Sequence, residues 1–219
     1  MAALSVIITA AVIKDLPDQI PMHYDFQGNV DRFGSKYELF IYPGLMVIMV
    51  IMWMLMLRYF RKKTESEDEK AAAEAKMNVK VIYISSIIMM LMELGFQISS
   101  IATAVKYAEN PVQVMPKEFS SWIFAILGTA MMVMGNFMPK TKRNAIFGLR
   151  TVWSVKNDKA WLESNRFAGV SFFICGLFMV ASAFLLEGMA VVNASIIILL
   201  VVTVSSVIYS YIAYKKYSD

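Results

Sequence analysis

The chain has 219 residues, of which 58% are hydrophobic and 17% are charged, and its mean hydropathy is +0.56. This balance excludes an ordinary soluble domain, in which about half of the residues are apolar and about a quarter are charged. The net charge of +4 and the isoelectric point near 9.0 favour contact with anionic membrane lipids over direct binding of nucleic acid, for which we find no motif. The single cysteine, Cys175, excludes an intrachain disulfide and a metal site built on cysteine pairs.

Uncharged apolar stretches that are long enough to cross a membrane recur along the chain. A spanning α-helix needs about 20 apolar residues to cross a hydrocarbon core about 30 Å thick, and it satisfies its backbone hydrogen bonds internally. The sequence therefore predicts an all-α polytopic membrane protein with about six transmembrane helices. Five spans are expected at residues 39–57, 79–105, 119–138, 168–186 and 189–213.

The first apolar stretch, residues 2–13, is shorter than these five spans. Twelve residues at about 1.5 Å each cover only about 18 Å. The stretch has no basic region before it, so a secretory signal peptide is a poor interpretation. We interpret it as a short or N-terminally trimmed first helix with Lys14 at its outer end, which groups residues 1–57 as two spans joined by the loop 14–38.

The polar loop 14–38 has the residues of a folded cap. Pro17 and Pro21 forbid a regular helix, and Gly28 permits a turn. Short extended runs such as residues 22–26 are suited to pair with a neighbouring strand.

Three side chains in the same loop could carry chemistry. His23, Asp25 and Asp31 could bind a metal ion, or His23 could sense pH. Zinc sites usually have more ligands than one histidine and two nearby carboxylates provide. We therefore expect no metal site here.

A charged linker, residues 58–78, follows the second span and is expected to continue as a solvated helix. Within the third span, Glu93 is followed one helical turn later by Gln97, on the same face. An ionisable side chain inside the membrane is costly and often functional. Glu93 is either a neutral carboxyl that bonds to a neighbouring helix or part of a polar cavity, and Asn136 is the candidate partner.

A basic insert, residues 139–167, separates the fourth and fifth spans, where Pro139 ends the fourth helix. Residues 156–166 are expected to form a separate amphipathic, interfacial helix, with Asn157 or Ser154 as its N-cap. Its tryptophan and lysine residues are typical of anchoring at the lipid headgroups. Alternatively, Arg150 and Arg166 of the insert form a partner-docking or ion-pairing site, because a guanidinium binds carboxylates in bidentate fashion. The two interpretations are compatible.

Basic residues alternate between the connections, which predicts the sidedness of the chain. The first connection holds three basic and five acidic residues, and the later ones hold seven, two, seven and no basic residues, followed by two in the tail. Cytoplasmic loops carry the excess of lysine and arginine. Both termini, the linker 58–78 and the insert are therefore expected in the cytoplasm, and the loop 14–38 outside.

The insert resembles the signature of the SdpI family of bacterial membrane proteins. The signature has a glycine, a hydrophobic residue, arginine and threonine, then two tryptophans, then Asn-Arg before a span. Family members commonly have proline where this chain has Val152. Residues 16–36 also resemble a small domain of unknown function that often precedes the signature, so residues 79–219 correspond to a four-span SdpI-like region. The matching signature positions are Gly148, Leu149, Arg150, Thr151, Trp153, Trp161, Asn165 and Arg166.

The resemblance implies an immunity or receptor-like protein of the bacterial cell membrane. Such a protein protects against an envelope-active secreted peptide toxin and can relay the toxin's presence to a cytoplasmic transcriptional repressor. The loop 14–38 would then be the part that an incoming peptide meets first. The resemblance implies neither an enzyme nor a cofactor. The alternatives are a small transporter or a membrane-embedded enzyme that uses Glu93, although the chain has no HExxH, GxSxG or Walker motif.

Overall fold

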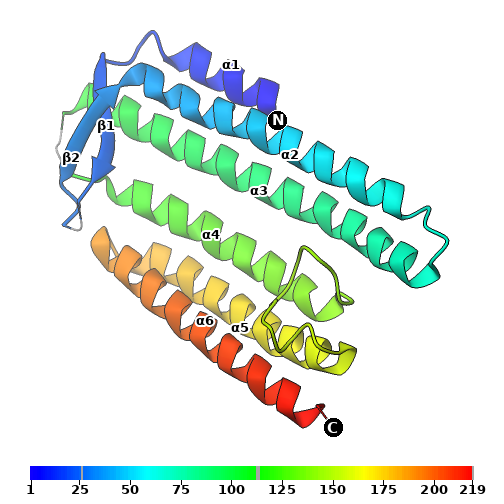
Figure 1. The fold of residues 1–219 in the computed structure, drawn as a ribbon. Coiled ribbons are helices and arrows are strands. Elements are labelled where there is room, and N and C mark those ends of the chain that lie inside the picture. Colours follow the sequence, from blue (N-terminus) through cyan, green and yellow to red (C-terminus); the bar gives the residue numbers. More distant parts are fainter. Residues whose placement is uncertain (26, 112–113, 219) are drawn as a thin grey trace.

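The protein is a bundle of α-helices with a β-hairpin across one end (Figure 1). The structure is a computed structural model that describes residues 1–25, 27–111 and 114–218. Among these residues, five helices are long and apolar enough to cross a membrane, which confirms the five predicted spans and the all-α polytopic class. They are α2 (Ile41–Lys63), α3 (Glu69–Glu109), α4 (Lys117–Phe137), α5 (Asp158–Leu185) and α6 (Met189–Lys216).

The first helix, α1 (Ala2–Val12), is a half-length element. Its 11 residues rise only about 16 Å, and Figure 1 shows its N-terminal end beside the middle of the bundle. Two of its polar side chains, Ser5 and Thr9, are completely buried. They face α3, and the contact described below fixes α1 against that helix.

The longest helix, α3, has 41 residues and is about 60 Å long, which is twice the thickness of the hydrocarbon core. Its N-terminus is capped by the Asp68 side chain, which accepts from the amides of Lys70 and Ala71. Because α2 continues to Lys63, the charged segment 58–78 is helical on both sides of a short turn. The first turns of α3 therefore extend beyond the apolar part of the bundle.

Two pairs of glycines bring α4 and α5 into close contact. A Cβ atom on Gly128 would lie 2.6 Å from the carbonyl oxygen of Gly176, and a Cβ atom on Gly135 would lie 2.5 Å from that of Gly169. Lipid tails are as apolar as leucine, so close packing of small residues is a main source of helix association in membranes. These contacts make α4 and α5 the tightly packed pair of the bundle.

The hairpin consists of β1 (Gln19–Tyr24) and β2 (Val30–Ser35), which pair in antiparallel fashion with an irregularity near His23. Gly28 has a φ of +85° in the connecting turn. Leu16, Ile20 and Leu39 pack with Ile101 and Ala104 of α3 in a buried cluster. Pairing occurs where the sequence predicts an extended run at residues 22–26, of which Phe26 lies outside the described residues. The all-α class thus carries a small sheet.

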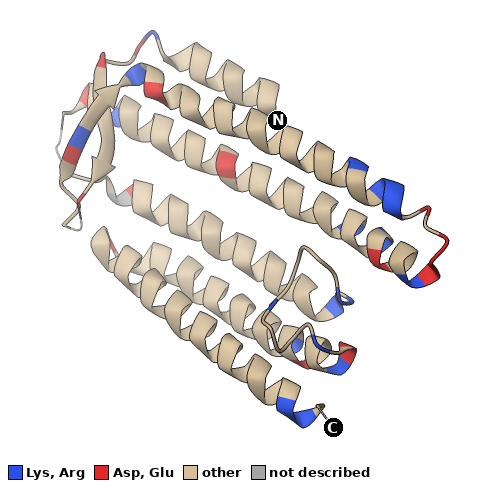
Figure 2. Cartoon of the chain, in the orientation of Figure 1, with Lys and Arg blue, Asp and Glu red and all other residues tan. Residues whose placement is uncertain are grey.

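Within the described part of the chain, charged residues lie at the two ends of the bundle, except for Glu93 of α3 (Figure 2). Lysine and arginine gather where α2 ends, where α3 and α5 begin, and where α6 ends. We call this the basic end. The opposite end is covered by β1 and β2, carries charges of both signs, and is called the hairpin end.

The structure corrects one prediction about the insert. Residues 156–166 were expected to form a separate interfacial helix, but Asp158 to Arg166 form the first turns of α5. The helix is continuous because nothing between Arg166 and the apolar run breaks it. Of the two predicted N-caps, Asn157 is confirmed and Ser154 is not the cap, since the Asn157 side chain accepts from the Ala160 amide at 2.8 Å.

Candidate functional sites at the two ends of the bundle

The signature loop, residues 141–157, is organised around Asn165 of α5. The Asn165 Oδ1 atom accepts from the Leu149 amide at 2.7 Å, and its Nδ2 atom donates to the Trp161 carbonyl at 3.0 Å. Gly148 has a φ of +107°, which L-residues rarely adopt, and Asn165 occupies the place that a Cβ atom would take. Gly148, Leu149 and Asn165 therefore act as one structural unit.

Trp161 is buried in the protein, which corrects the expectation that it anchors the chain among lipid headgroups. Its side chain is only 1% exposed, and its indole nitrogen donates to the Thr141 carbonyl at 2.9 Å. A buried tryptophan needs such a partner for its polar atom. The sequence pattern could not separate this role from anchoring, because both place tryptophan at the end of a span.

A second set of contacts ties the loop to α6. The Ser154 hydroxyl donates to the Leu149 carbonyl at 2.7 Å and accepts from the Thr151 amide at 2.9 Å. The hydroxyls of Thr151 and Ser210 lie 2.8 Å apart. The rings of Trp153 and Tyr211 meet edge to face with centroids 5.2 Å apart. Thr151 and Trp153 of the signature thus connect the loop to α6.

Residues that sequence reasoning missed tie the loop to α3. Asn78, which is buried, accepts from the Ala145 amide at 3.1 Å. The side chain of Asn144 accepts from the amides of Ile146 and Phe147 and donates to the Phe147 carbonyl. The available signal was the position of Asn78, directly before an apolar run.

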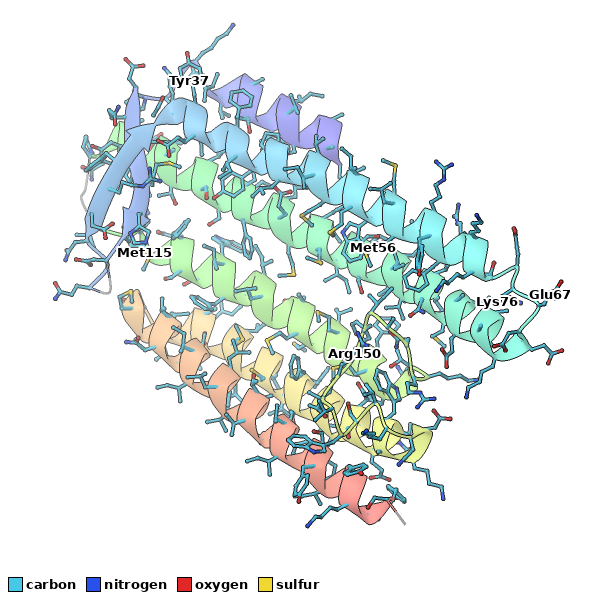
Figure 3. The ribbon with its side chains drawn as sticks, viewed as in Figure 1. Tyr37, Met56, Glu67, Lys76, Met115 and Arg150 are labelled. Atoms are coloured by element: carbon cyan, nitrogen blue, oxygen red, sulfur yellow. The ribbon has the colours of Figure 1, made fainter. Side chains whose placement is uncertain are left out.

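The two signature arginines are exposed, unlike the rest of the signature core. Arg150 donates to the Ala145 carbonyl of its own loop, and Figure 3 shows it at the basic end. Arg166 lies on the exposed face of α5. Val152, where the family commonly has proline, is 69% exposed. This surface is available for a partner at the basic end.

Gln97 and Glu93, the two polar residues singled out in the third span, are both buried in α3. Gln97 is fully buried, donates to Thr9 Oγ1 and the Ser5 carbonyl at 2.8 Å each, and accepts from Ser5 Oγ at 2.7 Å. Gln97 therefore holds α1. Glu93 is 8% exposed, and neither of its oxygens has a hydrogen-bond partner within the described part of the chain.

The suggested pairing of Glu93 with Asn136 is wrong. Asn136 lies on an exposed face near the end of α4, and its Oδ1 atom accepts from Lys140 Nζ at 3.1 Å. The spacing of the two residues in the sequence gave no information about which helix faces would meet.

At the hairpin end, a cavity of about 480 Å³ lies beneath the β-hairpin. Its walls come from the hairpin, from the start of α2, from α3, from the segment that leads into α4 and the first turn of α4, and from the first turn of α6. Figure 3 shows Met115 of this wall next to the hairpin. The structure thus brings together four of the six predicted loop residues, whereas Pro17 and Gly28 do not line the cavity. The four lining residues are Pro21, His23, Asp25 and Asp31.

Local hydrogen bonds set the charge of the hairpin side of the cavity. Asp25 Oδ1 accepts from the amides of Asn29 and Gln27 at 2.8 Å each, and the pKa of Asp25 is lowered, chiefly by the Asn29 amide. His23 Nδ1 lies 2.6 Å from Asp31 Oδ1. Burial raises the pKa of Tyr24 to about 12. The hairpin side therefore has the side chains of Asp25, Asp31 and His23 together with the phenol of Tyr24, which is neutral at neutral pH.

The remaining walls of the cavity were not foreseen from the sequence. Tyr42 of α2 and Ser100 of α3 share a hydrogen bond between their hydroxyls, and Thr103 lies nearly one turn further along α3. Phe119 packs against Tyr24 with ring centroids 5.8 Å apart. Serine and threonine near the end of an apolar helix were a weak signal for a polar wall. Within the described ranges, no group of three or more His, Cys, Asp and Glu side chains is placed to hold a metal ion.

The five spans define a multi-pass α-helical membrane protein. Its signature loop is fastened to α3 and α6 at the basic end, and its covered cavity lies at the hairpin end. Residues 140–214 match the model of the SdpI/YfhL protein family, and residues 1–47 match a domain of unknown function, DUF1648. The resemblance to the SdpI family is therefore confirmed, and so is the domain of unknown function at the N-terminus.

One curated relative matches along nearly its whole length. The chain is 25% identical over 216 residues to "Immunity protein SdpI" of Bacillus subtilis (strain 168), which covers 99% of this chain and 93% of the relative. No solved structure matches the chain. The likeness therefore includes the hairpin, the spans and the signature loop.

Proposed function

We propose that this protein is a non-enzymatic immunity protein of the bacterial cell membrane, which protects the cell against an envelope-active peptide toxin. The observation that carries the proposal is the similarity to Immunity protein SdpI, because it spans 99% of the chain and includes both ends of the bundle. A match confined to the spans would have reflected little more than shared hydrophobicity.

The sidedness of the bundle supports a role at the outer surface. Lysine and arginine at the basic end favour a cytoplasmic location for that end under the positive-inside rule. The signature loop and the C-terminus then face the cytoplasm, and the N-terminal end of α1 points toward it from the middle of the bundle. The β-hairpin and its cavity face outward, where a secreted peptide arrives.

The cavity has the chemistry to bind an amphipathic, cationic peptide. Most of its wall is apolar and suits a buried hydrophobic side chain, as in most ligand pockets. Asp25 and Asp31 place two carboxylates on the hairpin side, where they attract a lysine or arginine of the peptide. Binding here keeps the peptide at the surface and away from the lipid bilayer.

Relay to the cytoplasm is the second part of the proposal. The exposed side chains of Arg150 and Arg166 suit an acidic segment of a cytoplasmic protein such as a transcriptional repressor. Replacing both arginines with alanine should abolish a transcriptional response to the peptide while leaving protection intact. Equal loss of protection and of the response would instead indicate that the arginines hold the loop together.

Challenge of living cells tests the protective role. Cells that express the chain and cells with an empty vector are exposed to envelope-active peptides, beginning with any secreted peptide encoded beside the gene. We expect the inhibitory concentration of one peptide to rise at least about tenfold in the cells that express the chain. Unchanged sensitivity to the neighbouring peptide and to a panel of others would contradict the proposal.

A matched pair of variants locates the binding site. Val192→Trp places an indole in the cavity, whereas Val201→Trp makes the same change at a 58% exposed position of the same helix. Protection should be lost in the first variant and retained in the second, at equal protein levels in the membrane. If both variants protect fully, the peptide does not bind in this cavity.

A further inference from the structure

A crevice at the basic end, separate from the cavity under the hairpin, connects an open polar mouth to an apolar interior. Its mouth is a pocket of about 460 Å³ between the first turns of α3, the end of α4 and the start of α5. Its interior is a pocket of about 100 Å³ between α3 and the end of α4. The two pockets share Met77, Lys140 and Thr141 as lining residues, so they adjoin each other, and we call them together the crevice.

The mouth of the crevice is positively charged. The two pockets together are lined by five lysine and arginine residues and by two carboxylates. One of the carboxylates, Asp158, is already paired with Arg143 at 3.3 Å. Lys140 Nζ donates to the amide oxygen of Asn136, which carries no charge. Four lysines therefore face a single remaining carboxylate, Glu74.

The interior of the crevice is apolar and lies at the depth where the spans begin. Val81, Ile84, Phe137 and Phe147 line it, and Lys80 stands at its edge. Phe137 is the last residue of α4, and residue 79 is the first of the third apolar run. The mouth is therefore level with lipid headgroups and the interior with the first carbons of the acyl chains.

We propose that this crevice binds an anionic phospholipid, with its phosphate among Lys70, Lys140 and Lys142 and an acyl chain against Phe137 and Phe147. Charge complementarity selects the headgroup, since basic pockets between transmembrane helices at a cytoplasmic surface bind anionic lipid heads. The apolar interior selects a lipid over a free anion, because inorganic phosphate would leave Val81, Phe137 and Phe147 uncovered.

A lipid in this position contacts α3, the signature loop and the start of α5 at the same time. The crevice is lined by α3, by the end of α4 and by Trp161 of α5, whose indole donates to the Thr141 carbonyl. Binding therefore stabilises the signature loop together with α3. The site does not depend on the proposed immunity, because none of its lining residues lines the cavity at the hairpin end.

Native mass spectrometry of the purified full-length chain tests the proposal, with dioleoyl phosphatidylglycerol and dioleoyl phosphatidylcholine added to detergent micelles. The test variant is Lys140→Gln/Lys142→Gln. The control is Lys62→Gln/Lys156→Gln, which removes the same charge from exposed positions of the basic end outside the crevice. Each lysine near the lipid contributes roughly a factor of five to the affinity, so removing two of them should weaken the binding of phosphatidylglycerol roughly 30-fold. The control should change by less than about threefold.

Three outcomes would overturn the proposal. Equal affinity for the two lipids would mean that charge does not select the ligand. Equal losses in the test and control variants would mean that the lipid responds to diffuse surface charge. Displacement of phosphatidylglycerol by millimolar sodium phosphate would mean that the site takes a free anion.

Two further variants keep the test valid if the glutamine substitutions disturb folding. Lys140→Arg/Lys142→Arg keeps the charge and should retain phosphatidylglycerol binding to within about threefold. Lys80→Gln, at the edge of the apolar interior, should weaken binding roughly fivefold without changing the loop. Loss of binding in the arginine variant, or none in Lys80→Gln, would count against the site.

Discussion

Gly148→Ala is the sharpest test of the claim that Asn165 organises the signature loop. The φ of Gly148 is +107°, and an L-residue held in so sparsely populated a conformation costs about 1–3 kcal/mol. The new Cβ atom would collide with Asn165 Oδ1 and lie 3.2 Å from Trp161 Cζ2. Asn165 must then release the Leu149 amide, and an unpaired buried donor costs about 1–3 kcal/mol more. The expected loss of stability is about 2–6 kcal/mol.

Thermal unfolding of the purified protein in detergent measures this loss, and limited trypsin digestion reports on the loop, which contains Lys142 and Arg143. We expect an unfolding temperature lower by roughly 4–24 °C, at about 2–4 °C for each kcal/mol, and faster cleavage in the loop. The control is Gly44→Ala in α2, where an added Cβ atom meets nothing within 4 Å and helix propensity favours alanine by about 1 kcal/mol. Wild-type stability and cleavage of Gly148→Ala would refute the assigned role of Asn165.

Three further substitutions test other parts of the structure. Gly135→Leu should separate α4 from α5 and lower the unfolding temperature by at least about 5 °C, and normal stability would mean that the close contact with Gly169 is not needed. Glu93→Gln should leave protection within about twofold and should not lower the unfolding temperature, since it removes an ionisable group from a buried site; lost protection at normal protein levels would favour transport through Glu93. The hydrogen bonds that lower the pKa of Asp25 stabilise the folded state at pH values above the aspartate pKa of the unfolded chain, which is about 4. This stabilisation is lost as the pH falls through the pKa that Asp25 has in the folded chain. Asp25→Asn should therefore flatten the decrease in unfolding temperature between about pH 5 and pH 2, and an unchanged pH profile would show that the Asn29 contact contributes nothing.

Local patterns in the sequence predicted the elements that depend on local physics. Apolar length located five spans, because the bilayer thickness fixes the number of residues needed. Asn157 was a predicted cap and is one, since capping involves only residues three positions apart. The prolines and Gly28 indicated a non-helical cap where the hairpin lies.

Contacts between distant segments could not be predicted in this way. Gln97 bonds to Ser5, and Asn136 lies away from Glu93, because helix packing and not sequence spacing decides which faces meet. Trp161 is buried because the loop folds back over α5, which no periodicity reveals. The glycine pairs of α4 and α5 left a signal that was not used, namely a spacing of seven residues in each helix.

The central claim is that the cavity under the hairpin opens to the outside of the cell and the signature loop to its interior. Single cysteines at Gln27→Cys in the hairpin turn and Val152→Cys in the loop, each in a Cys175→Ala background, can be labelled in intact cells with a maleimide that does not cross membranes. We predict that Gln27→Cys is labelled at once and that Val152→Cys is labelled only after the membrane is opened. Labelling of Val152→Cys in intact cells while Gln27→Cys stays protected would contradict the account, because no secreted peptide could then reach the cavity from outside.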